Sequence, residues 1–278
     1  MAPDYFVPEH ALVSADGEAP EKWLHVLHGV FGSGANWRLF ARKLTAACPR
    51  WGVVLVDLRG HGASQGAPPP HTLQAAADDV LRLERRLGIP IGGVAGHSFG
   101  GKVALTYLER RDAPVERAFV LDASPGPRAS RATGADATER VLETLESLPE
   151  PLASRERFVE LALEAGHARA VTEWLAMNVR RSDDGFRLRL DLPAIRAMLD
   201  DYHAADLWSV VERVENAEKL DVILGGASDT VDPEARSRLR QLAATEPRVR
   251  LHVLERAGHW LHVDDPEGLL DVFRSALG

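Results

Sequence analysis

With 278 residues, the chain is long enough for one large domain, or for a domain that carries a second unit inserted into it. Its 45% hydrophobic and 27% charged residues are ordinary for a globular protein, and a net charge of −8 argues against nucleic acid as a partner. The single cysteine, Cys48, excludes an intrachain disulfide and a thiolate metal cluster, and we interpret it as a small buried hydrophobe. The first residues lack the pattern of a signal peptide and no apolar run is long enough to span a bilayer, so we expect a cytoplasmic protein without a membrane partner.

Short apolar runs alternate with helical patterns along the chain. Six runs are predicted to be strands: Trp23 to Leu27, Val53 to Val56, Ile91 to Ala95, Ala118 to Leu121, Val222 to Leu224 and Val249 to Leu254. Helical spacing of apolar residues follows from Leu73 to Leu87, from Val103 to Leu108 and from Pro266 to Ala276. Since the runs are apolar throughout, they predict strands buried on both faces, in an α/β fold with a mostly parallel central sheet flanked by helices.

The alternation stops between about Gly126 and Asp206. That stretch is helical by pattern, rich in arginine and without a convincing buried strand. We predict a core domain of residues 1–125 and 207–278 and a helical cap or lid of residues 126–206. The alternative is a set of extra helices on one face of the sheet.

A candidate nucleophile lies in Gly96-His97-Ser98-Phe99-Gly100, a Gly-x-Ser-x-Gly pattern between a predicted strand and a predicted helix. A serine at such a turn has a strained backbone and a side chain directed away from the sheet, and the glycines let the flanking chain approach closely. The helix that follows directs its first N–H groups towards the reacting oxygen. We therefore predict Ser98 as nucleophile, with His97 packed beneath the turn and without a proton-transfer role.

A tetrahedral intermediate needs backbone N–H donors for its negative oxygen. The turn His28-Gly29-Val30-Phe31-Gly32-Ser33 follows the strand Trp23 to Leu27, and we predict an oxyanion hole formed by the N–H groups of Val30 and Phe99. The alternative is a simple tight turn. His28 is interpreted as a residue that braces this turn, and the segment Asp57 to Ser64, after the next strand, as a rigid loop behind the site.

The candidate general base is His259, one of eleven histidines, in Ala257-Gly258-His259-Trp260 after the last predicted strand. A histidine in that loop can reach the serine hydroxyl over the edge of the sheet. His262 is the second choice for this role, although it fits better at the start of a supporting helix.

Two aspartates compete for the acid that orients the imidazole. Asp229 follows the strand Val222 to Leu224, and Asp122 ends the strand Ala118 to Leu121. Either carboxylate could accept a hydrogen bond from the imidazole, and either could simply cap its loop. We favour Asp229, which gives the chain order Ser, Asp, His, and keep Asp122 as the alternative.

Together these segments resemble the α/β-hydrolase superfamily. The segment Phe31-Gly32-Ser33, the lysine after Gly100-Gly101, and Asp122-Ala123-Ser124-Pro125 are similar to bacterial esterase/thioesterase-like proteins and their mitochondrial abhydrolase relatives. The resemblance implies an α/β-hydrolase fold with the cap inserted after the sixth core strand, and hydrolysis of small-molecule carboxylic esters or acyl thioesters without a metal or organic cofactor. In several of these relatives the aspartate that matches Asp122 is the better candidate for the acid, so the resemblance favours Asp122. The mitochondrial relatives also suggest an aspartate of the cap, at the position of Asp191.

The function predicted from these residues is that of a serine hydrolase that forms an acyl-enzyme intermediate. Two alternatives stay open: a C–C bond hydrolase of the same fold, and a non-catalytic ligand receptor that retains the triad. In the predicted cap, an apolar acyl pocket or ordinary core could be formed by Trp174, Leu175, Met177, Phe186 and Trp208. Arg180 and Arg181 could meet an anionic leaving group or could be solvated surface residues.

Overall fold

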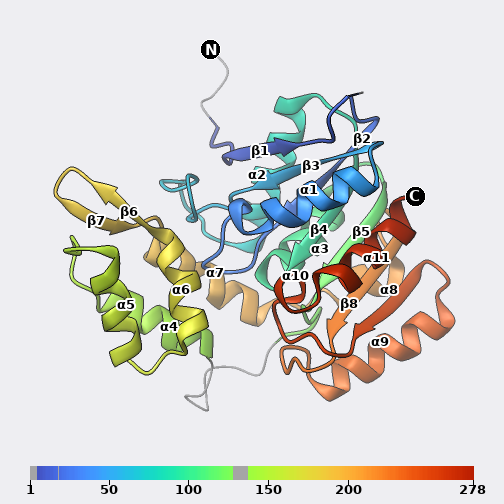
Figure 1. Ribbon diagram of the computed structural model, residues 1–278. Helices are drawn as coiled ribbons and strands as arrows, with labels where there is room; N and C mark the ends of the chain where they lie inside the picture. Colours follow the sequence, from blue (N-terminus) through green and yellow to red (C-terminus); the bar gives the residue numbers. More distant parts are fainter. Residues whose placement is uncertain (1–4, 18, 128–136) are drawn as a thin grey trace.

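The computed structural model describes residues 5–17, 19–127 and 137–278 (Figure 1). Its centre is a seven-stranded sheet in the order β1-β3-β2-β4-β5-β8-β9. The strands are β1 (His10–Val13), β2 (Lys22–Leu27), β3 (Trp51–Val56), β4 (Ile91–His97), β5 (Val115–Leu121), β8 (Ala217–Gly225) and β9 (Val249–Leu254). Only the edge strand β1 is antiparallel to its neighbour in this sheet; the other pairs are parallel. The predicted α/β fold with a mostly parallel sheet is confirmed.

Helices cover both faces of the sheet (Figure 1). Apolar side chains on one face pack with those of α1 (Arg38–Ala47), α10 (Leu261–Asp264) and α11 (Pro266–Leu277), and Cys48 is buried there. The other face packs against α2 (Leu73–Leu87), α3 (Phe99–Arg110), α8 (Trp208–Arg213) and α9 (Pro233–Thr245). This two-sided burial explains why the parallel strands are apolar throughout rather than alternating.

An insertion between β5 and β8 lies at the left of Figure 1. Its elements are α4 (Ala137–Glu146), α5 (Arg155–Glu164), α6 (Arg169–Leu175), the 3₁₀ helix η2 (Ala176–Asn178), β6 (Val179–Ser182), β7 (Gly185–Leu188) and α7 (Leu192–Ala204). The insertion follows the fifth strand along the chain, not the sixth as predicted, because the described chain before β2 supplies one short strand. Residues 128–136 of the predicted cap lie outside the described residues.

A fully buried lysine joins α3 to both ends of the insertion. The Nζ of Lys102 donates to the backbone carbonyl oxygens of Gly126, Tyr202 and Ala205 at 2.8, 2.7 and 2.9 Å. An ammonium group has three N–H donors and no acceptor, so three carbonyl groups match it, and this compensates for its removal from water. Lys102 therefore links the helix that begins after Ser98 to the two points where the chain enters and leaves the insertion.

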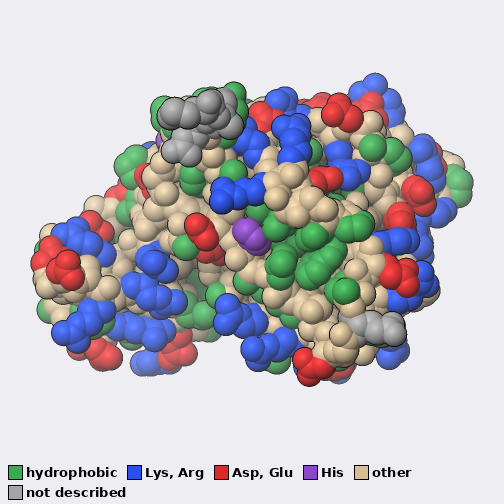
Figure 2. Space-filling model, turned by 90° about the horizontal axis from the view of Figure 1, so that it is seen from above, with side chains coloured by type: hydrophobic (Ala, Val, Ile, Leu, Met, Phe, Trp, Pro, Cys, Tyr) green, Lys and Arg blue, Asp and Glu red, His purple; other side chains and the backbone are tan. Residues whose placement is uncertain are grey.

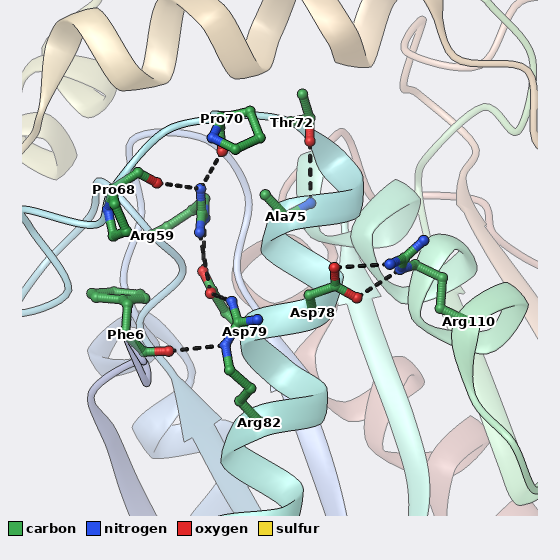
Figure 3. A network of polar contacts seen from close by, with 10 residues as sticks. All are labelled: Phe6, Arg59, Pro68, Pro70, Thr72, Ala75, Asp78, Asp79, Arg82 and Arg110. Atoms are coloured by element: carbon green, nitrogen blue, oxygen red, sulfur yellow. Dashed lines mark hydrogen bonds and ion pairs between the residues drawn. The ribbon is translucent and has the colours of Figure 1, made fainter. Parts of the chain in front are cut away.

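A buried ion pair stabilises the loop after β3, which was predicted to be rigid (Figure 3). The guanidinium of Arg59 donates to the Asp79 carboxylate through Nε at 2.7 Å and Nη2 at 3.1 Å, and to the carbonyl oxygens of Pro68 and Pro70 through Nη1. In the same loop, Asp57 accepts the N–H groups of Gly34 and Ala63 at 2.8 and 2.9 Å. These bonds tie the loops after β2 and β3 to each other and to α2.

Two buried histidines make the fold sensitive to acid. Burial lowers the pKa of His25, on β2, to about 4, and that of His61 to about 3. Within the described chain, neither ring nitrogen of His25 has a hydrogen-bond partner, and neither has Nε2 of His61. Both imidazoles are therefore held neutral in the folded protein.

We expect the free energy of unfolding to be highest above pH 7 and to fall as the pH decreases from about 6.5 towards 4, because the unfolded chain then binds protons that the folded chain excludes. At pH 5, each of the two imidazoles is expected to lower the free energy of unfolding by about 2 kcal/mol relative to its value at pH 7.5. Urea unfolding at pH 7.5 and pH 5 measures this loss, and in His25→Met the loss should be smaller by about 2 kcal/mol. An equal loss in the wild type and the variant would contradict the assignment to His25.

Candidate active site

Ser98 lies at a sharp turn between β4 and α3. Its backbone has φ 53° and ψ −117°, in a region that non-glycine residues rarely adopt, and its side chain is partly exposed. A Cβ atom built on Gly96 would lie 2.0 Å from the carbonyl oxygen of Gly100, and one on Gly100 would lie 2.4 Å from that of Leu27. Glycine is therefore required on both sides of the serine because α3 begins in direct contact with β4 and with the end of β2.

The loop after β2 lies against this turn. A Cβ atom on Gly29 would be 3.4 Å from Cβ of Ser98. Neither Val30 nor Phe99 donates its N–H to another described residue, as expected for a turn and for the first position of a helix. The buried Asn178, from the insertion, donates through Nδ2 to the carbonyl oxygen of Phe31 at 2.8 Å, which fixes the next peptide of the loop. Two unpartnered N–H groups are thus brought to the same end of the sheet as Ser98.

His28 braces the loop, as predicted. Its Nε2 accepts the N–H of Leu58 at 2.9 Å, and its Nδ1 lies 2.8 Å from the carbonyl oxygen of Gly29, to which it donates. Burial lowers the pKa of His28, consistent with a neutral ring that accepts through one nitrogen and donates through the other.

His259 is hydrogen bonded to Asp122, not to Asp229. Its Nδ1 lies 2.7 Å from Oδ2 of Asp122, whose side chain is fully buried at the end of β5. Asp122 also accepts the N–H of Gly225 at 3.0 Å and the hydroxyl of Ser228. Three donors therefore hold this carboxylate in place.

The prediction that Asp229 faces His259 is wrong. The two residues on either side of Asp229 point towards the pair: Ser228 donates to Asp122, and the Thr230 hydroxyl lies 3.0 Å from Nδ1 of His259. The side chain of Asp229, between them, is exposed. Asp191, the other aspartate implied by resemblance, caps α7 by accepting the N–H of Ala194 at 3.2 Å.

His97 packs beneath the turn, as predicted. Its Nε2 donates to the carbonyl oxygen of His259 at 2.8 Å, and the two rings lie 4.7 Å apart. Burial, with the neighbouring His259 and His262, holds the pKa of His97 well below its usual range. A neutral His97 thus fixes the backbone that carries His259.

Ser98 and His259 line one cavity of about 180 Å³ at the carboxyl ends of the strands. Val30 and Trp260 from the core, and Val141, Val171 and Trp174 from the insertion, line it too. Trp174 and Trp260 both line it, and their ring centroids lie 5.6 Å apart. The insertion therefore forms part of the wall of the cavity that contains Ser98 and His259.

Most of the apolar residues suggested for an acyl pocket lie elsewhere. Of the five, only Trp174 lines the cavity; Leu175 and Trp208 are buried in the core, Phe186 lies in the β6–β7 hairpin, and Met177 is exposed. Arg180 and Arg181 are exposed on the same hairpin and do not line the cavity.

Sequence reasoning missed the hydroxyl groups of Ser228 and Thr230 and the cavity wall formed by Trp37, Val141 and Val171. The only sequence signal for these hydroxyls was that Ser228 and Thr230 lie on either side of Asp229.

Within the described ranges, no group of three or more His, Cys, Asp or Glu side chains is arranged to hold a metal ion, and no helix has the length and apolarity needed to cross a membrane.

The family model described as "Alpha/beta hydrolase family" matches residues 26–272. The chain is 30% identical to the sn-1-specific diacylglycerol lipase ABHD11 of Mus musculus, covering 94% of this chain and 83% of that protein. It is 25% identical to the Esterase YbfF of Escherichia coli, covering 91% of each. A solved marine microorganism esterase has the same fold, with a TM-score of 0.81 at 21% identity over 96% of this chain and 98% of that one. From this match, the chain is a hydrolase that belongs to the alpha/beta hydrolase family.

Proposed function

We propose that the protein cleaves carboxylic esters or acyl thioesters with Ser98 as nucleophile, His259 as general base and Asp122 as the acid. The observation that carries the proposal is the bond between the buried Asp122 and the imidazole of His259, which lines the same cavity as Ser98. This bond fixes the tautomer in which Nδ1 carries the proton and Nε2 is free to accept one. The names of the relatives, a lipase and an esterase, support ester bonds as the target.

In the first half-reaction, Ser98 Oγ attacks the acyl carbonyl carbon while Nε2 of His259 takes the hydroxyl proton. The carbonyl oxygen becomes negative and accepts the N–H groups of Val30 and Phe99, which have no other described partner. When the intermediate collapses, the bond to the alcohol or thiol breaks and His259 protonates that leaving group.

In the second half-reaction, water attacks the acyl-enzyme and gives its proton to His259. The tetrahedral intermediate then releases the carboxylic acid and restores the Ser98 hydroxyl. The imidazole is charged only between these transfers, and the Asp122 carboxylate, held by Gly225 and Ser228, stabilises that charge.

We propose that residues 126–206 act as a cap on the core formed by residues 1–125 and 207–278. Side chains of α4 and α6 form part of the cavity wall, which supports this role.

Acidic and basic side chains are interspersed over the face shown in Figure 2, including the part of the insertion at its left, so no broad basic field is visible there.

Labelling with an alkyl fluorophosphonate tests the proposed function. We expect one covalent adduct per chain, located at Ser98 by peptide mass spectrometry, and turnover of activated esters or acyl thioesters. Absence of labelling would favour a non-catalytic receptor. Cleavage of 1,3-diketones without cleavage of esters would favour a C–C bond hydrolase.

A further inference from the structure

Besides His259, three histidines line the cavity that holds Ser98, namely His28, His97 and His262, and His262 lies farthest along the chain. It belongs to α10, directly after the loop that carries His259, and its ring stacks on Trp37 with centroids 4.1 Å apart and planes at 25°. The ring lies 5.8 Å from that of His97, which in turn lies 4.7 Å from that of His259. His97 is thus close to both rings, and the stack on Trp37 holds His262 in a fixed orientation.

The imidazole of His262 has an unused hydrogen-bonding atom. Its Nδ1 is buried and has no hydrogen-bond partner in the described part of the chain. The Nδ1 atom is sealed from water, so the nitrogen left to meet a ligand in the cavity is Nε2, for which the described chain also offers no hydrogen-bond partner.

Burial, with a smaller contribution from His259, lowers the pKa of His262 to about 4. The ring is therefore neutral at pH 7 and offers one donor and one acceptor. The described residues that line the cavity include no Lys, Arg, Asp or Glu. These properties fit an uncharged polar group and give neither a carboxylate nor an ammonium group a counter-charge.

Asn36, which adjoins Trp37, adds a second polar group to the same wall. Its Oδ1 accepts the N–H of Ser33 at 2.7 Å, whereas among the described residues its Nδ2 has only the Met177 thioether sulfur as a partner, at 3.8 Å. Because a thioether is a weak acceptor, the amide N–H groups can turn to a substrate oxygen with little loss.

We propose that His262 and Asn36 form a subsite for a hydroxyl group on the substrate. The protein then prefers esters with a neutral hydroxyl group in the alcohol or acyl portion over esters of the same size that are purely hydrocarbon there. This inference rests on the proposed ester hydrolysis and specifies the class of ester.

Two matched pairs of esters test the subsite: 2-hydroxyethyl butyrate against propyl butyrate, and propyl 5-hydroxypentanoate against propyl hexanoate. Each pair replaces a hydroxyl group by a methyl group, in the alcohol or in the acyl portion. We expect the wild type to favour the hydroxylated member of at least one pair about tenfold in kcat/KM, the size expected for one hydrogen bond between neutral groups.

In His262→Phe, which keeps an aromatic ring against Trp37 but has no ring nitrogen, the preference should fall to the part that Asn36 alone supports. In His262→Asn, which keeps a donor and an acceptor, more of it should remain. The ratio of kcat/KM values is independent of the fraction of folded enzyme, so a poorly folding variant still gives a result. Equal rates for both members of both pairs in the wild type, or a preference that is undiminished in His262→Phe, would overturn the subsite. Failure to cleave any of the four esters would instead overturn the ester-hydrolase proposal, and the subsite with it.

Discussion

The Ser98→Ala variant is expected to lose about 10⁵- to 10⁶-fold in kcat on an activated ester, with little change in the thermal unfolding midpoint. The loss is large because alanine cannot form the acyl-enzyme, and the remaining turnover comes only from the N–H donors and from substrate binding. Stability should change little because the Ser98 side chain is only partly buried and its hydroxyl forms no hydrogen bond to another described residue.

Ser237→Ala is a matched control, since Ser237 is exposed on α9 and does not line the cavity. It should keep both turnover and phosphonate labelling, whereas Ser98→Ala should lose both. Turnover by Ser98→Ala at the wild-type rate would remove the serine mechanism.

Asp122→Asn is expected to lower kcat about 10⁴-fold, and Asp229→Asn to leave it within about twofold of the wild type. An asparagine side chain places either an amide N–H or a weaker neutral acceptor at Nδ1 of His259, and it no longer stabilises the imidazolium. The Ser228 hydroxyl and the Gly225 N–H would also lose their charged acceptor. The exposed Asp229 has no such contacts.

Both asparagine variants are compared on one activated ester, with circular dichroism as the check on folding. If Asp229→Asn were the more damaging of the two, the roles proposed for these aspartates would be reversed. A similar small loss in both would mean that the imidazole is oriented by another group, and Thr230, 3.0 Å from Nδ1, would be the next residue to replace.

The positions of Ser98 and His259 could be predicted because local sequence determines them. The glycines around Ser98 are needed for backbone contacts between adjacent elements, so the strand, the turn and the helix all leave a signal within a dozen residues. His259 follows the last strand of a parallel sheet, and the carboxyl ends of such strands meet at one edge.

The aspartate that is hydrogen bonded to His259 could not be predicted in the same way. Both aspartates follow strands that end at this edge, and the choice depends on which side chain turns inward. Asp122 has a positive φ of 45°, which aspartate tolerates better than most residues, but nothing in its neighbours specifies this conformation. The strand β1 and the β6–β7 hairpin were missed for a related reason: they are short and partly exposed, so they lack the continuous apolar runs of the buried strands.

The bonds of Lys102 limit how a substrate can reach the cavity. Swinging the whole insertion outward as a rigid flap would pull the carbonyl groups of Gly126, Tyr202 and Ala205 away from an ammonium group that has no access to water. Leaving a buried charge without hydrogen-bond acceptors costs several kcal/mol. A hinge motion at the two points where the chain enters and leaves the insertion is therefore unfavourable. Small displacements within the insertion, for example where Trp174 of α6 meets Trp260 of the core, would leave the Lys102 bonds intact and the residues around α3 in place.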